Sequence, residues 1–146
     1  EMCIRDSNNS IKKKIENSVR SNLNIILCVG ESYSTYKTKK SIQFIKSQLQ
    51  VLTKKTIKNT IIAYEPIWSI GTGIIPSEQY LNKTFDHLTQ YCKKKYSLKP
   101  KILYGGSVNE NNIKVLKNIY NCSGFLIGGA SLKYKSFTNL IKNYYK

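Results

Sequence analysis

One carboxylate is distinguished by the residues around it. Glu65 follows the apolar residues Ile61 and Ile62, which predict a buried strand, and Pro66 holds Glu65 extended and ends that strand. A carboxylate at a strand end can remove a proton from a bound molecule, because exclusion of water raises its basicity. A lone Glu-Pro pair is more often an ordinary surface feature, so the residues that follow must decide between these interpretations.

The segment after Glu65 is unusually apolar for a loop. It carries large apolar side chains and then two glycines, which permit positive φ: Ile67, Trp68, Ile70, Gly71, Thr72 and Gly73. Exposed apolar side chains in a loop suggest that the loop covers a bound molecule. The sequence therefore predicts a catalytic base with a mobile lid.

Two further glycine turns follow apolar runs. Gly105 and Gly106 precede Ser107, and Gly128 precedes Gly129. Glycine pairs are common in plain turns, but backbone N–H groups left uncovered by side chains also bind anions. Two such pairs after successive strands favour a phosphate site.

The elements that position these groups alternate along the chain. Short apolar runs near Ile25, Ile61, Ile102 and Phe125 predict four strands. Helix-start signals stand at Pro76 and Ser77, at Asn109 and after Ser136. Apolar residues recur at helical spacing before, between and after the strands, in five stripes: Ile11, Ile15 and Val19; Ile42, Ile45 and Leu49; Leu81, Phe85, Leu88 and Cys92; Ile113 and Leu116; Phe137, Leu140 and Ile141. Repeated strand-helix units indicate an α/β fold with a parallel sheet.

The run at residues 63–73, AYEPIWSIGTG, resembles the signature of the triosephosphate isomerase family. Residues 24–31, 101–107 and 124–132 are similar to the family's fifth, seventh and eighth strands with their turns. The resemblance implies a TIM (β/α)8 barrel of which residues 7–146 form the carboxy-terminal half, since a whole barrel has eight units and about 250 residues. Residues 1–6 match neither a targeting signal nor the family, and we interpret them as a junction or artefact.

The resemblance also implies a reaction and a site. The family interconverts dihydroxyacetone phosphate and glyceraldehyde 3-phosphate through an enediolate, in glycolysis and gluconeogenesis, without a cofactor. By resemblance Glu65 is the general base, and the phosphate is held by Gly71, Ser107, Gly128 and Gly129.

Other residues are expected around that site by the same resemblance. Trp68 bonds to Glu31 when the lid is open, Tyr104 latches the closed lid, and Ile70 shields the base. Pro66, Ile67, Thr72 and Gly73 complete the lid, and Leu126 lines the pocket. Ile74 stands where the family often has Lys, which changes the far hinge.

The family's electrophilic His and substrate-binding Lys belong to the other half of the barrel. His87, the only histidine, falls in a predicted helix and is expected at the surface. We therefore expect this chain alone to be inactive. The family forms homodimers, but the loop that joins its subunits also belongs to the other half.

Charge and cysteine content test other classes of protein. Lys and Arg number 24 against 8 Asp and Glu, a net charge of +16, which suggests a non-catalytic basic half-barrel binding phosphorylated ligands or nucleic acid. The lysines are spread along the chain without a recognition motif, so no specific nucleic acid is expected. Another phosphate-binding barrel isomerase is a second alternative, although the Glu-Pro lid separates it. The four cysteines form no metal-ligand spacing, and no run spans a membrane, so we expect a cytoplasmic protein without metal.

Overall fold

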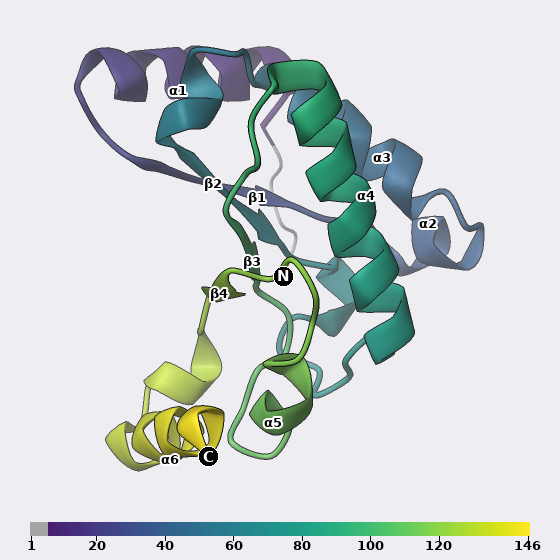
Figure 1. The fold of residues 1–146 in the computed structure, drawn as a ribbon, viewed down its shortest axis with the longest axis vertical. Coiled ribbons are helices and arrows are strands. Elements are labelled where there is room, and N and C mark those ends of the chain that lie inside the picture. Colours follow the sequence, from purple (N-terminus) through teal and green to yellow (C-terminus); the bar gives the residue numbers. More distant parts are fainter. Residues whose placement is uncertain (1–5) are drawn as a thin grey trace.

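The structure is a computed structural model that describes residues 6–146, so the predicted junction lies almost entirely outside the described residues. Four strands form one parallel sheet in the order β1-β2-β3-β4 (Figure 1). The strands are β1 (Ile25–Val29), β2 (Thr60–Tyr64), β3 (Ile102–Tyr104) and β4 (Gly124–Phe125). This confirms the predicted α/β fold, and the sheet corresponds to half of an eight-stranded barrel.

Helices separate the strands and flank the sheet. They are α1 (Asn8–Arg20), α2 (Tyr33–Lys37), α3 (Ser41–Gln48), α4 (Glu78–Tyr96), α5 (Ile113–Leu116) and α6 (Tyr134–Tyr145). Single 3₁₀ turns add η1 (Leu49–Val51), η2 (Thr56–Asn59), η3 (Ile67–Ser69) and η4 (Gly129–Ser131). In Figure 1 α3 and α4 lie side by side, and α5 and α6 lie near the carboxy-terminal end of the chain.

Local hydrogen bonds explain which helix boundaries were predicted. The Ser77 hydroxyl accepts the N–H of Tyr80 at 3.2 Å and caps α4, as its sequence indicates. The Asn109 side chain accepts the N–H groups of Asn111 and Asn112, and its carbonyl oxygen accepts that of Ile113, which is the capping pattern predicted for this residue. The regular turn of α5 begins at Ile113. The last helix begins before Ser136, at Tyr134, and the short α2 was not predicted because it has no apolar stripe.

The core lies between one face of the sheet and the helices. Phe85 and Leu88 of α4 and Ile62 and Ile102 of the sheet are fully buried. Each side chain of this size contributes about 1.5–3 kcal/mol when removed from water. The burial of Phe85, Leu88 and their α4 neighbours confirms the predicted apolar stripe of that helix.

The opposite face of the sheet is less covered. Successive side chains alternate between faces, so Ile26 and Cys28 point away from the buried Leu27 and Val29. Ile26 is 50% exposed, and Ile61 lies beside it in the register of β1 and β2. The helices therefore cover only one face of the sheet completely.

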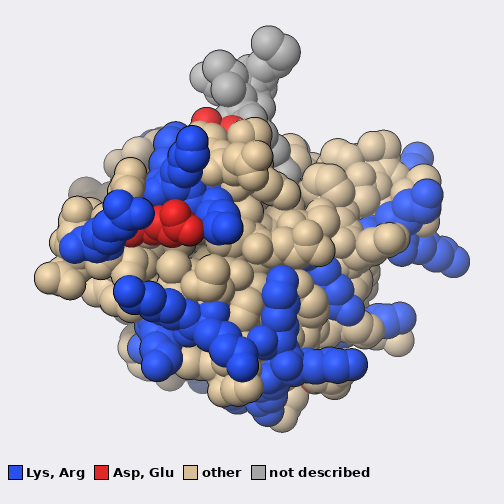
Figure 2. Space-filling model, turned by 90° about the horizontal axis from the view of Figure 1, so that it is seen from above, with Lys and Arg blue, Asp and Glu red and all other residues tan. Residues whose placement is uncertain are grey.

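Lysine and arginine side chains are distributed widely over the surface in Figure 2, over several elements. Among residues 6–146 one ion pair is found, between Lys14 Nζ and Asp6 Oδ2 at 2.6 Å. None of the described helices is both long and apolar enough to cross a bilayer. His87 lies in the middle of α4, half-buried, with Nδ1 2.7 Å from the carbonyl oxygen of Lys83.

Gly30 should be essential for stability. A Cβ at this position would overlap the backbone carbonyl of Glu65, which cannot move without shifting β2. We expect Gly30→Ala to lower the free energy of unfolding by about 2–4 kcal/mol, measured by urea denaturation. Gly129→Ala is the matched control, because its Cβ would meet nothing within 4 Å, and it should change stability by less than about 0.5 kcal/mol. Equal effects of both substitutions would contradict this account.

Candidate active site

Glu65 is the first residue after β2, and its backbone is fixed on both sides. Its N–H donates to the carbonyl oxygen of Val29 at 2.8 Å, and the N–H of Ile67 donates to that of Glu31 at 3.0 Å. Only a glycine at position 30 leaves room for the Glu65 carbonyl group. The end of β1 thus fixes the backbone of Glu65, from which the carboxylate side chain extends.

The side chain of Glu65 extends over the end of β3. A Cβ on Gly105 would lie 2.6 Å from Oε1 and 2.7 Å from Cγ of Glu65. The neighbouring Gly106 leaves room for the Tyr104 hydroxyl and for Ser69, whose Oγ would be 2.6 Å from a Cβ there. Both glycines, predicted as part of a phosphate turn, therefore have a packing role that the sequence analysis missed.

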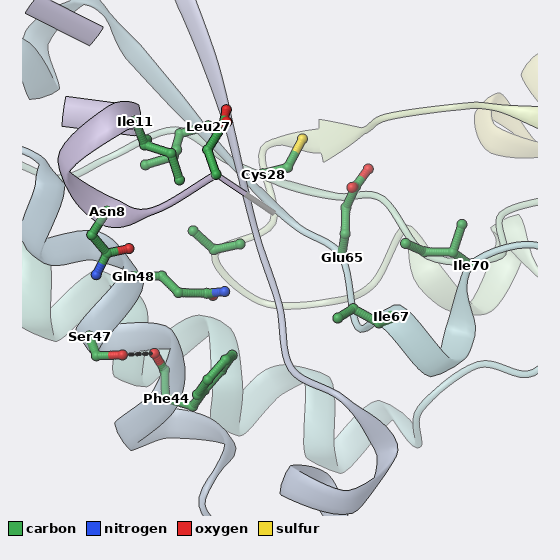
Figure 3. Close-up of a pocket in the computed structure, with 12 residues that line it drawn as sticks. Asn8, Ile11, Leu27, Cys28, Phe44, Ser47, Gln48, Glu65, Ile67 and Ile70 are labelled. Atoms are coloured by element: carbon green, nitrogen blue, oxygen red, sulfur yellow. Dashed lines mark hydrogen bonds between the residues drawn. The ribbon is translucent and has the colours of Figure 1, made fainter. Parts of the chain in front are cut away.

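Cys28 is a second group beside the carboxylate that the sequence analysis missed. Burial, followed by the charge of Glu65 and a hydrogen bond to Glu65, raises the pKa of its thiol to about 11. Figure 3 shows both side chains at the same hollow. The proximity of Cys28 to Glu65 follows from strand register. Cys28 pairs with Ala63, and Glu65 lies two residues beyond Ala63 in the chain, on the same face of the sheet.

Two hollows meet at Glu65 and Ile70. One, of about 550 Å³, is bounded by α1, β1 and α3 (Figure 3). The other, of about 610 Å³, lies at the ends of β2, β3 and β4. It is lined by Gly105 and by six residues that the sequence predicts for the site: Gly71, Gly73, Ser107, Leu126, Gly128 and Gly129. The structure thus brings the predicted base and the predicted phosphate-binding residues to one hollow.

The glycines at the far end of this hollow leave their backbone open. A Cβ on Gly128 or Gly129 would meet no atom within 4 Å. Gly129 begins the 3₁₀ turn η4, and the Ser131 N–H and hydroxyl both donate to the Gly128 carbonyl oxygen, at 2.9 and 2.7 Å. A side chain here would extend into the open hollow without displacing any protein atom.

The loop after Glu65 has the conformation that its glycines predict. Gly71 and Gly73 have φ of 69° and 77°, and the Ile70 side chain at the tip is 47% exposed. The N–H of Gly73 donates to Ser107 Oγ at 3.0 Å, and Ser107 Oγ donates to the Ser69 carbonyl oxygen at 2.6 Å. Within the loop, Thr72 Oγ1 donates to the Trp68 carbonyl oxygen. Ser107 therefore fastens the loop at two points.

Ser69 and Tyr104 connect the loop to β3. The Ser69 hydroxyl donates to the Ile74 carbonyl oxygen at 2.6 Å and lies 3.0 Å from the Tyr104 hydroxyl. Burial is the main cause that raises the pKa of Tyr104 to about 12, and the hydrogen bond with Ser69 opposes the shift. Tyr104 therefore contacts the loop through Ser69, a residue that the sequence analysis missed, and its role as a latch of the closed lid stays a prediction.

Five predicted residues line neither hollow: Glu31, Pro66, Trp68, Thr72 and Tyr104. Glu31 is fully buried and accepts the indole N–H of Trp68 at 3.3 Å. It also accepts the hydroxyl of Tyr64 at 3.1 Å. Burial and the charge of Glu31 raise the pKa of Tyr64 well above its usual range, so this phenol remains a donor. These residues therefore lie behind the loop and outside the two hollows. Across the described part of the chain, no three His, Cys, Asp or Glu side chains gather to hold a metal ion.

Comparison with known proteins decides the family. A family model described as triosephosphate isomerase matches residues 2–144. The chain belongs to the triosephosphate isomerase family. It is 40% identical over 132 residues to the triosephosphate isomerase of Campylobacter jejuni subsp. jejuni, covering 90% of this chain and 56% of that protein.

Other relatives in this family show the same partial coverage. The triosephosphate isomerase of Ureaplasma parvum is 40% identical over 142 residues, covering 97% of this chain and 60% of that protein. The Neurospora crassa enzyme of the same name is 38% identical over 134 residues, covering 88% and 54%. The chain thus spans about half the length of the curated relatives it matches, in their carboxy-terminal part.

The contact between Cys28 and Glu65 has a measurable consequence. A thiol pKa of about 11, against 9.0 for a free thiol, lowers the thiolate fraction at pH 7.5 about a hundredfold. We expect iodoacetamide to alkylate Cys28 slower than free cysteine by about that factor, measured by peptide mass spectrometry. Glu65→Gln removes one negative charge and should increase the rate several-fold, whereas burial remains. Glu78→Gln, on the exposed start of α4, is the control, and equal rates in the two variants would contradict the contact.

Proposed function

We propose that the full-length protein carrying this chain interconverts dihydroxyacetone phosphate and glyceraldehyde 3-phosphate, with Glu65 as the general base. The observation that carries the proposal is the shared hollow at the strand ends, with the Glu65 carboxylate at one end and the open backbone of Gly128 and Gly129 at the other. Membership of the triosephosphate isomerase family supports this reaction. The substrate's phosphate group would lie against the glycines and its carbonyl-bearing carbons near Glu65.

The proton transfer follows from this arrangement. The Glu65 carboxylate takes a proton from the carbon beside the carbonyl, and the electrons of the broken C–H bond form a C=C bond. The carbonyl oxygen then carries the enediolate charge. Return of the proton from Glu65 to the neighbouring carbon, together with transfer of the hydroxyl proton of the first carbon to the former carbonyl oxygen, gives the isomeric product, so no net proton or electron is exchanged. Because Cys28 is a neutral thiol, it adds no second negative charge beside the base.

The electrophile for this reaction would come from outside the chain. The two hollows at Glu65 are lined by no histidine or lysine among the described residues. His87 lies on α4, away from both hollows. A group that stabilises developing negative charge on oxygen commonly contributes several kcal/mol to catalysis. We therefore propose that this chain alone does not turn over substrate.

The loop 67–73 would act as the lid of the site. Ile70 lines both hollows and is exposed at the loop tip, so a small movement toward Glu65 would place an apolar side chain between the base and water. Gly71 lines the hollow beside Ser107, where its N–H would reach a phosphate oxygen. The positive φ of Gly71 and Gly73 would allow this movement.

Shortening the base tests the proposal. In the full-length protein, Glu65→Asp withdraws the carboxylate by one methylene, and such misplacement costs about a hundredfold in turnover. We expect kcat for triose phosphate isomerisation to fall by about that factor while KM changes only a few-fold. Glu78→Asp should retain normal kinetics. Unchanged turnover in Glu65→Asp would contradict the assignment of the base.

A charge placed in the glycine hollow tests the phosphate site separately. Gly128→Asp puts a carboxylate where the phosphate would lie, so we expect binding of glycerol 3-phosphate to weaken by at least about tenfold in calorimetry. Thr138→Asp makes the same change of charge on the exposed part of α6 and should leave binding intact. Equal loss in both variants would favour the general basic surface, and binding of single-stranded RNA would then be measured against salt.

A further inference from the structure

The loop residue Trp68 is held by a buried carboxylate that has several partners. Oε1 of Glu31 accepts the hydroxyl of Tyr64 at 3.1 Å, the indole N–H of Trp68 at 3.3 Å and the hydroxyl of Tyr80 at 3.2 Å. Glu31 is fully buried, and it takes no part in the ion pair found among residues 6–146. Its stabilisation therefore depends on neutral donors.

These three donors share the two oxygens of Glu31 unequally. The Tyr64 hydroxyl lies 3.1 Å from Oε1 and 3.3 Å from Oε2, whereas the Trp68 indole and the Tyr80 hydroxyl contact Oε1 alone and therefore share its acceptor capacity. Any movement of the loop that carries Trp68 away breaks the indole bond. Tyr64 and Tyr80 belong to β2 and α4 and not to the loop, so movement of the loop alone leaves their hydroxyls beside Glu31.

A different contact holds the indole ring itself. The ring of Tyr36, from α2, lies 4.6 Å from the Trp68 ring between centroids, at an interplanar angle of 37°. Tyr36 is supported in turn by an edge contact with Tyr80 at 5.0 Å. Aromatic pairs of this kind add stability beyond that of the apolar area they bury. Tyr36 therefore favours the position of Trp68 seen here.

We propose that Tyr80 and Tyr36 are positioning residues that set how readily the 67–73 loop leaves its resting position, with opposite effects. The Tyr80 hydroxyl promotes release, because it competes with the indole and keeps Glu31 hydrogen-bonded after the indole has left. The Tyr36 ring opposes release, because its contact with Trp68 is lost when the loop moves. The proposal rests on the proposed role of this loop as a lid.

The sequence supplies its own reporter for this proposal. Trp68 is the only tryptophan of this chain, and its indole N–H resonance in an ¹⁵N-labelled sample of the full-length protein is the one that Trp68→Phe removes. Hydrogen exchange of that N–H measures how often it leaves Glu31. We expect Tyr80→Phe, which keeps the ring and removes the hydroxyl, to slow the exchange about three- to tenfold. Tyr36→Leu should accelerate exchange by about the same factor.

Two conservative variants serve as controls. Tyr36→Phe keeps the ring contact and should exchange at the wild-type rate, and so should Tyr91→Phe, in the second half of α4. Acceleration in both Tyr80→Phe and Tyr36→Leu would show a merely loosened structure and overturn the proposal. If Tyr36→Leu does not fold, Tyr80→Phe decides alone. An unchanged or faster exchange rate of the Trp68 indole in Tyr80→Phe then rejects the proposal. The readout needs no substrate, so its failure is distinguishable from failure of the isomerase proposal, which shows as unchanged turnover in Glu65→Asp.

Discussion

The close approach of Glu65 to two glycines is the constraint on which the site depends. Gly30 at the end of β1 admits the Glu65 carbonyl, and Gly105 at the end of β3 admits its side chain. Because β2 ends between these two glycines, the residue that follows it, Glu65, has little freedom of position. The carboxylate is therefore positioned by backbone contacts of three parallel strands, which are far stiffer than contacts between surface side chains.

Around this fixed carboxylate the remaining polar groups are mostly neutral. Cys28 is a protonated thiol, and the buried Glu31 is surrounded by phenol and indole donors. The many lysines lie elsewhere on the surface and line neither hollow at Glu65. The large positive charge of the chain thus acts on the site as a distant field, which salt screens, and not through direct contacts.

Much of the fold could be predicted because each strand is a short apolar run bounded by glycine or proline, and the parallel order followed from the alternation with helices. The loop after Glu65 was also evident, because its apolar residues and glycines are contiguous. Cys28 and Tyr80 were missed because their relevance depends on register and on the direction of a helix, which a sequence does not contain. The cap at Asn109 could be predicted because its side chain bonds to N–H groups only two and three residues further along the chain. The catalytic and phosphate-binding roles stay predictions.

The double attachment of the loop to Ser107 links movement and binding thermodynamically. In the resting structure the Ser107 hydroxyl is already donated to Ser69, and its oxygen already accepts the Gly73 N–H. An anion that takes the hydroxyl must displace a partner within the loop. The measured affinity for any phosphate ligand is then the intrinsic affinity multiplied by the population in which that exchange has occurred. Substitutions that alter only the loop equilibrium will therefore change ligand affinity without touching the ligand.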